Sequence, residues 1–177
     1  YAYDLHVFPR TLHLDQDGKP EFHISTSLMK PHSRGTVRLQ SSDPALAPII
    51  DIGYFSHPDD MPRYIQGIRL AREIAATSPL ADLILEEIHP GSGKTTDAEL
   101  NQAIRAGART YHHPVGTCSM GKPDNCEAVV SSRAKVYGVE GIYVIDASIM
   151  PTIPAANTNV PTIMVAERCA DWLLEEL

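Results

Sequence analysis

The sequence predicts an α+β fold, in which an antiparallel sheet with helices is followed by a C-terminal strand and helix. Alternating apolar runs between turn signals occupy residues 1–50, and helical spacing with start signals follows over residues 59–107. A short apolar run that ends in an acid then precedes a last helical stretch. With 43% hydrophobic and 21% charged residues, the composition is that of a globular protein able to bury a sizeable core.

The first 50 residues are predicted to form strands and turns. Asp15–Gly18 ends in the Asp-Gly dipeptide that favours a hairpin turn. Alternate residues from Phe22 to Leu28 then share one face of an extended run, and residues 36–39 form a second alternating run after the Arg34-Gly35 turn. These runs predict an antiparallel sheet with one solvated face.

Helices are predicted next. The first begins near Asp59-Asp60 with Pro62 in its first turn, and Leu70 and Ile74 widen its apolar stripe. Ser78-Pro79 ends this helix, and residues 79–87 are predicted to form a short second helix. The capping box Thr96-Asp97-Ala98-Glu99 starts another helix, which ends near Gly107.

The C-terminal region is predicted to contain one buried strand and one helix. Gly141–Asp146 is a short apolar run that ends in an acid, as buried strands often do. Asn159 starts the last helix, with Pro161 in its first turn. The apolar stripe of this helix comprises Ile163, Ala166, Ala170 and Leu173.

Charge and composition exclude several classes of partner. The net charge of -7 argues against nucleic acid, since phosphate binding requires clustered Lys and Arg. No apolar run approaches the roughly 20 residues of a membrane segment, and no signal peptide is visible. Cys118, Cys126 and Cys169 lack metal-type spacing and are expected to be reduced thiols, which favours a cytoplasmic location.

His113 is a candidate proton acceptor, because imidazole titrates near neutral pH. Pro114 fixes the backbone after it, and Gly116 allows close approach to a flat ligand. A surface or structural role also fits a histidine in such a turn. The neighbouring His112 does not make the pair a metal site, because adjacent residues rarely bind one ion without a third ligand.

Asp146 and Asn159 are the other local candidates. Asp146 follows the predicted strand, where an acid can bind a ribose or ribityl hydroxyl or simply form a turn. Asn159 suits a helix N-cap, and the helix N-terminus that it marks carries partial positive charge. By contrast, His89–Thr96 only superficially resembles a phosphate-binding loop, since Ile88 stands where the first glycine is needed. That segment is predicted to be an exposed connector with a capping threonine.

Three long segments resemble one known family. Pro31–Leu39, Tyr111–Gly121 and Val136–Glu167 are similar to the C-terminal half of the glucose-methanol-choline (GMC) oxidoreductases. Within the last of them, Asn157–Glu167 is especially similar to the choline dehydrogenase branch. The resemblance implies that residues 1–135 are a substrate-binding domain of GMC C-terminal type. It implies that residues 136–177 are the C-terminal strand and helix of an FAD-binding α/β domain.

The resemblance also implies an activity. FAD would be the cofactor, a small alcohol the substrate, and His113 and Asn159 the catalytic residues. His113 would accept the alcohol proton or hold the alkoxide while hydride passes to flavin N5, and Asn159 would orient the oxygen. The cofactor-binding residues would be His112, Asp146, Ala147, Asn159 and Val160. The family's GxGxxG fingerprint is absent from this sequence, so we expect a fragment whose partner is the missing N-terminal FAD-binding half.

Three alternatives remain open at this point. A hydroxynitrile lyase would use the same fold and histidine without net redox change. A binding module would fold and bind a ligand without catalysis. A structural domain would use the apolar Ile142–Ile145 run to pack on another protein or to form a homodimer.

Overall fold

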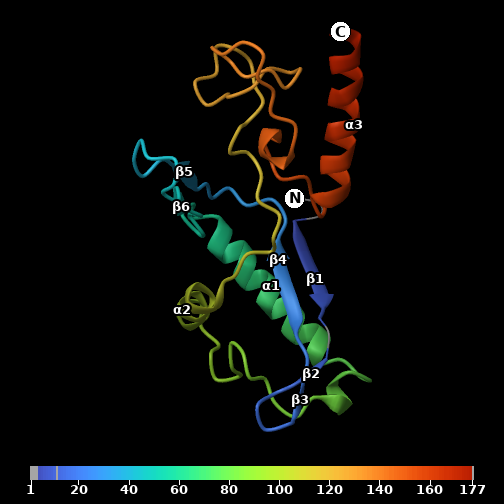
Figure 1. Cartoon of the computed structure of the whole chain (residues 1–177). Helices are drawn as coiled ribbons and strands as arrows, with labels where there is room; N and C mark the ends of the chain where they lie inside the picture. Colours follow the sequence, from blue (N-terminus) through green and yellow to red (C-terminus); the bar gives the residue numbers. More distant parts are fainter. Residues whose placement is uncertain (1–3, 11, 177) are drawn as a thin grey trace. The chain divides into compact units, whose positions relative to one another are not determined.

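The computed structural model describes residues 4–10 and 12–176 and divides the chain into two compact units. Unit 1 comprises residues 1–35 and 52–109, and unit 2 comprises residues 36–51 and 110–177. Both helices and strands occur, so the predicted α+β class is confirmed (Figure 1).

Unit 1 begins with two antiparallel strand pairs. β1 (Leu5–Pro9) pairs with β4 (Ile24–Leu28), and β2 (His13–Leu14) pairs with β3 (Pro20–Glu21). The turn between β2 and β3 contains Gly18 at φ +76°, a left-handed conformation that favours glycine. The predicted hairpin is therefore confirmed.

Helix α1 (Asp60–Ala75) runs alongside β4, as Figure 1 shows. Gly67 permits this close packing. A Cβ atom added there would lie 2.3 Å from Cγ2 of Thr26 on β4, which is well inside van der Waals contact. The start of α1 agrees with its predicted start near Asp59-Asp60.

Helix α2 (Asp97–Gly107) begins with the predicted capping box. The Glu99 N–H donates to Oγ1 of Thr96 over 3.3 Å, and the Thr96 N–H donates to Oε2 of Glu99 over 2.9 Å. Hydrogen bonds from Thr96 hold the pKa of the Glu99 carboxyl below its usual range. α1 and α2 share an apolar core formed by Met61, Ile65, Leu100 and Ile104.

Two predictions about unit 1 are wrong. Residues 79–87 contain only the 3₁₀ turn η1 (Ala81–Leu83), because Leu83 and Leu85 are 77% and 100% exposed and give a short helix no apolar face to bury. Leu70 and Ile74 do not widen the buried stripe of α1 and are 42% and 41% exposed. The described β1–β4 ribbon has only two strands and is too narrow to cover a broader helix face.

Unit 2 has few regular elements. β5 (Thr36–Arg38) and β6 (Ile49–Asp51) form an antiparallel pair, η2 (Ala147–Ile149) is a 3₁₀ turn, and α3 (Asn159–Glu176) is the last helix. Together with the two pairs of unit 1, this makes three separate two-stranded pairs in the described residues, where the sequence predicted one antiparallel sheet. The apolar core of unit 2 is formed by Val130, Ala134, Ile149 and Cys169.

The predicted strand at Gly141–Asp146 is absent from the described structure. Only Tyr143 makes a β-bridge, with Lys135, and Ile142 is 50% exposed. A buried strand needs neighbours that take up its backbone N–H and C=O groups, and this single bridge supplies few of them. Val144 and Ile145 nevertheless pack against the core of unit 2.

The buried face of α3 also differs from the prediction. Val165, Cys169 and Trp172 face the core, whereas Ile163 is 54% exposed and Ala170 is exposed. The sequence pattern did not single out this buried face, because its residues are a cysteine, a tryptophan and only one aliphatic side chain. Among the described residues, no helix combines the length and the apolar character that a bilayer-spanning segment needs.

Candidate active site at the start of helix α3

His113 is fixed at one ring nitrogen by Thr158, the residue that immediately precedes α3. Its Nδ1 lies 2.9 Å from Oγ1 of Thr158 and accepts the Thr158 N–H over 3.3 Å. His113 is half-buried, and Thr158 is only 8% exposed. The loop histidine is thereby held against the N-terminus of the last helix.

These bonds constrain how the imidazole can act. A backbone N–H can only donate, so its bond to Nδ1 of His113 favours the tautomer with hydrogen on Nε2. The Thr158 hydroxyl can donate to Nδ1 in that tautomer or accept from it in the other one. In both cases Thr158 engages Nδ1, and Nε2 is the ring atom left for a substrate.

The rings of Tyr111 and His113 meet edge to face, with centroids 4.9 Å apart. His113 is therefore positioned by an aromatic ring as well as by Thr158. His112 lies between Tyr111 and His113 in sequence but adopts φ +64° and is exposed. Its N–H donates to Oγ1 of Thr110 over 2.9 Å. The two adjacent histidines thus occupy different environments.

The start of α3 presents backbone donors at an exposed surface. Asn159 is exposed and Val160 is 71% exposed. N–H groups in the first turn of a helix lack intrahelical acceptors, and the helix dipole adds partial positive charge there. This is the kind of helix end that suits the electron-rich edge of a flat ligand.

The N-cap of α3 is Thr158 and not Asn159, which corrects the sequence interpretation. The Thr158 carbonyl accepts the N–H of Thr162 over 2.9 Å, the first intrahelical bond. Asn159 is therefore already the first helical residue, and its side chain is not needed to cap the helix. Sequence reasoning missed Thr158; its one signal was its place next to Asn159 in the same motif.

Asp146 has a structural role of the turn-forming kind. Its Oδ1 accepts the Ser148 N–H over 2.8 Å and so caps η2. The adjacent Ala147 is half-buried as the first residue of that turn. Asp146 itself is exposed, so this capping bond does not close its carboxylate off from other partners.

Backbone bonds join the two motifs found in the sequence. The Cys118 N–H donates to the Ser148 carbonyl over 3.0 Å, and the Met120 N–H donates to the Ile149 carbonyl over 2.8 Å. Gly116 lies in the same loop at φ +88°, and a Cβ atom there would lie 3.3 Å from the Met150 carbonyl oxygen. Residues that are about 30 positions apart in sequence therefore form one local structure.

The residues of unit 2 fit the isoalloxazine part of a flavin. Such a ring needs close backbone approach and hydrogen-bond donors near its pyrimidine edge. The room left by Gly116 is taken by the Met150 carbonyl oxygen, so the fit rests on the start of α3, where the exposed Asn159 and Val160 supply donors with a favourable dipole.

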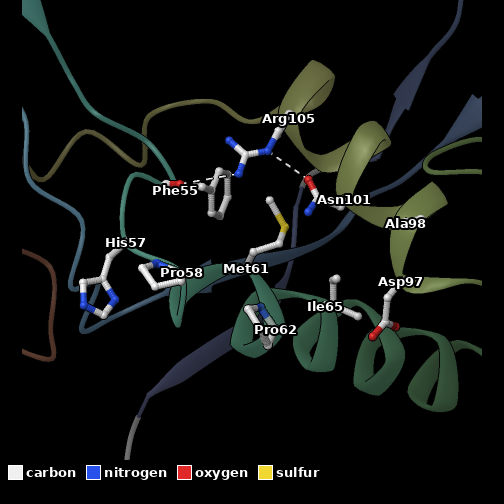
Figure 2. A pocket seen from close by; sticks show the side chains of 10 residues that line it. All are labelled: Phe55, His57, Pro58, Met61, Pro62, Ile65, Asp97, Ala98, Asn101 and Arg105. Atoms are coloured by element: carbon white, nitrogen blue, oxygen red, sulfur yellow. Dashed lines mark hydrogen bonds between the residues drawn. The ribbon is translucent and has the colours of Figure 1, made fainter.

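A separate pocket lies within unit 1, between α1 and α2 (Figure 2). Its volume is about 370 Å³, and Met61 and Ile65 form its apolar part. Arg105 Nε donates to Oδ1 of Asn101 over 2.9 Å, and its guanidinium lies 5.8 Å from the centre of the Phe55 ring. Nothing in the sequence patterns pointed to this pocket.

The segment His89–Thr96 is a connector tied down by its own contacts. Lys94 Nζ donates to the Pro90 carbonyl over 2.8 Å, and Thr96 caps α2. Arg72 donates to the carbonyls of Gly91 and Lys94 over 3.1 Å and 2.9 Å. Lys94, the lysine that would bind phosphate in a phosphate-binding loop, thus donates to a carbonyl of its own loop.

Comparison with known proteins gives consistent matches. The family profile described as GMC oxidoreductase matches residues 31–166. The chain is 44% identical over 150 residues to oxygen-dependent choline dehydrogenase 1 of Chromohalobacter salexigens, covering 85% of this chain and 27% of that protein. It is 43% identical over 147 residues to an alcohol dehydrogenase [acceptor] of Pseudomonas putida, covering 83% and 26%.

A solved structure resembles the fold as well. An FAD-dependent oxidoreductase from Chaetomium thermophilum superposes with a TM-score of 0.80 at 34% identity, covering 90% of this chain and 27% of that one. The chain thus spans little more than a quarter of the length of the relatives that it matches.

Proposed function

Because the chain belongs to the GMC oxidoreductase family, we propose that it is the C-terminal part of an enzyme that oxidises an alcohol CH–OH group to a carbonyl. The family match confirms the resemblance expected from the sequence. One relative is named an alcohol dehydrogenase and one similar structure an FAD-dependent oxidoreductase, which supports an oxidoreductase activity with FAD as cofactor. The observation that carries the proposal is the His113–Thr158 bond, which holds a histidine beside the first residue of α3.

His113 is proposed to accept the alcohol proton or to hold the alkoxide as it forms. Thr158 engages Nδ1, so Nε2 would meet the substrate hydroxyl. In the tautomer with hydrogen on Nε2, which the Thr158 N–H favours, Nε2–H donates to the substrate oxygen and holds it in place. In the other tautomer, the lone pair on Nε2 takes the hydroxyl proton. Proton transfer of this kind accelerates a reaction by about 10²–10⁴-fold. FAD, when bound, would supply the acceptor for the hydride from the carbon that carries the oxygen.

Asn159 is proposed to orient the substrate, and the start of α3 is proposed to bind the flavin. The exposed Asn159 amide would hydrogen-bond the substrate oxygen, and the Val160 N–H would face the pyrimidine edge of the flavin. The helix dipole would favour negative charge on that edge. His112, Asp146 and Ala147 are proposed as further cofactor contacts, the last two towards the ribityl and pyrophosphate groups.

The division into residues 1–135 as substrate-binding part and 136–177 as flavin-domain part belongs to the same proposal. Val130 and Ala134 pack with Ile149 and Cys169 in unit 2, so residues on both sides of that boundary share one apolar cluster. The two parts would therefore meet through a packed core and not through a flexible linker.

The proposed substrate is a small alcohol, with choline as the first compound to test. The support is the Chromohalobacter relative, which is named an oxygen-dependent choline dehydrogenase. The Pseudomonas relative is named an alcohol dehydrogenase [acceptor], so simple alcohols are the second group of compounds to test.

The test uses the complete gene product loaded with FAD. Under anaerobic conditions, choline or a simple alcohol should bleach the flavin absorbance, and dye and O₂ are then compared as acceptors. His113→Ala should keep FAD but lower the rate of flavin reduction by about 10²–10⁴-fold. His89→Ala, in the exposed connector of unit 1, is the control and should react normally. Full flavin reduction by His113→Ala, or FAD binding without reduction by any alcohol, would overturn the proposal.

A further inference from the structure

Two histidines and an aspartate of unit 1 come together from two loops. His32 lies in the segment after β4, and His57 and Asp59 lie directly before α1. Nδ1 of His32 is 3.7 Å and Nδ1 of His57 is 3.8 Å from Oδ2 of Asp59. We propose that these three residues bind a zinc ion.

The separations suit a tetrahedral ion. Zinc binds imidazole nitrogen and carboxylate oxygen at about 2.0–2.1 Å, so two ligand atoms on one tetrahedral ion lie about 3.3–3.4 Å apart. The two distances to Oδ2 of Asp59 exceed that spacing by about 0.4 Å. One candidate ligand atom from each of the three residues lies within 4.8 Å of the others. Small side-chain rotations would therefore close the site.

A buried carboxylate holds the backbone of both histidines. Asp60 is 1% exposed and accepts the His32 N–H over 2.9 Å and the Ser33 N–H over 2.8 Å. Ser33 Oγ in turn accepts the His57 N–H over 3.0 Å. The two loops are thus cross-linked through Asp60 and Ser33 before any ion arrives. Such support of ligand positions is typical of built metal sites.

The exposure of the ligands leaves room for a further ligand on the ion. The side chains of His32, His57 and Asp59 are 35%, 42% and 64% exposed. Three protein ligands with one position open to water or a small anion is a common zinc arrangement. Two imidazoles and one carboxylate favour zinc over Mg²⁺ or Ca²⁺, which prefer oxygen ligands.

The hydrogen bond between Asp59 and His57 would be exchanged on binding. The Asp59 N–H donates to Nδ1 of His57 over 3.3 Å, which is a long bond. An ion at Nδ1 would replace it, and water can take over the Asp59 N–H because Asp59 is exposed. This exchange costs little beside three metal–ligand bonds.

A second cluster in unit 1 serves as the internal comparison. His13, Glu21 and His23 also bring candidate ligand atoms together, and Nε2 of His13 lies 3.2 Å from Oε2 of Glu21. His13 and Glu21 face each other across the β2–β3 pair, whose strands have two residues each. The described structure shows for this cluster no buried carboxylate like Asp60, so we assign the ion to the His32 cluster.

The test is a calorimetric zinc titration of the chelator-treated complete gene product near neutral pH. His32→Ala and His57→Ala should each weaken one zinc site by at least about tenfold compared with wild type. Asp59→Asn, which keeps the side-chain shape, should weaken the same site. His89→Ala removes an exposed histidine of the same unit outside both clusters and should bind as wild type does.

Ser33→Ala tests whether the surrounding structure holds the three ligands in place for the ion. It keeps all three side chains but removes the hydroxyl that accepts the His57 N–H, so zinc affinity should fall by about 10–100-fold. Circular dichroism verifies that each variant folds. The proposal is overturned if His32→Ala, His57→Ala and Asp59→Asn all bind zinc as His89→Ala does, or if only His13→Ala loses the site.

Discussion

Unit 1 and unit 2 are organised by different means. In unit 1, regular helices and strands are joined by charged side chains in polar networks, such as Asp60 with Arg63 and Arg72 with Glu87. In unit 2, loops are joined by backbone hydrogen bonds around a small apolar core, and the candidate active site lies in those loops. The less regular unit thus carries the proposed chemistry, while the more regular unit depends on the buried Asp60 and on partly buried ion pairs.

The largest effect should come from Asp60→Asn in unit 1. The carboxylate of Asp60 accepts bonds from His32, Ser33 and Arg63, and an amide can replace only part of them. Loss of one partner from a buried ionic network costs about 3–5 kcal/mol. Urea unfolding should report this loss, and the exposed Asp171→Asn on α3 should leave stability unchanged. Equal stability of the two variants would contradict the idea that buried charges organise unit 1.

The same carboxylate makes the stability of unit 1 depend on pH. Burial alone would raise the pKa of Asp60, but N–H bonds from His32 and Ser33 and the charge of Arg63 outweigh it and hold the pKa below 3.8. A lowered pKa in the folded state stabilises the protein above the unfolded value near 3.8, and this contribution disappears as pH falls through the folded value. Urea midpoints measured at falling pH should decline for wild type more steeply than for Asp60→Asn.

Gly67→Ala should come next, at about 1–3 kcal/mol of destabilisation. The new methyl group would lie 2.3 Å from Cγ2 of Thr26, so α1 would be pushed away from β4. Gly107→Ala is the matched control, because it also lies in a helix but its Cβ would meet nothing within 4 Å. That control should be neutral or slightly stabilising, since alanine favours helix over glycine. Thermal unfolding of both variants should show a lower unfolding temperature for Gly67→Ala and an equal or higher one for Gly107→Ala.

Thr158→Val should have the smallest effect on stability and act on catalysis in unit 2. It keeps the side-chain shape but removes the hydroxyl that lies 2.9 Å from Nδ1 of His113. One hydrogen bond contributes about 0.5–1.5 kcal/mol, so kcat should fall by about 2–10-fold. Thr158→Ser should restore the wild-type rate and its pH profile. If both variants match wild type in kcat and pH profile, Thr158 does not position the imidazole.

Features with a local cause could be predicted from the sequence. The turn at Asp15–Gly18, the capping box at Thr96 and the starts of α1 and α3 each depend on residues within one turn of each other, and all are present. The motifs around His113 and Asn159 were likewise recognisable, and the structure brings His113 to the residue beside Asn159.

Features that depend on distant residues could not be predicted in this way. Whether Gly141–Asp146 becomes a strand depends on neighbours that no local pattern specifies. The partner of His113 lies 45 positions away, and the Ser33–His57 bond spans 24 positions. The buried face of α3 was misplaced because several stripes of that helix fit the same period, and only the packing of Cys169 and Trp172 selects one.

The burial of Cys169 makes one thiol a reporter of unfolding. Cys169 is 3% exposed, and burial raises the pKa of its thiol, so it holds little of the reactive thiolate while α3 is docked. Cys126 is exposed and offers an alkylating reagent immediate access. A label that enters first at Cys126 and only later at Cys169 would therefore time how often α3 separates from the core of its unit, without any substitution in the chain.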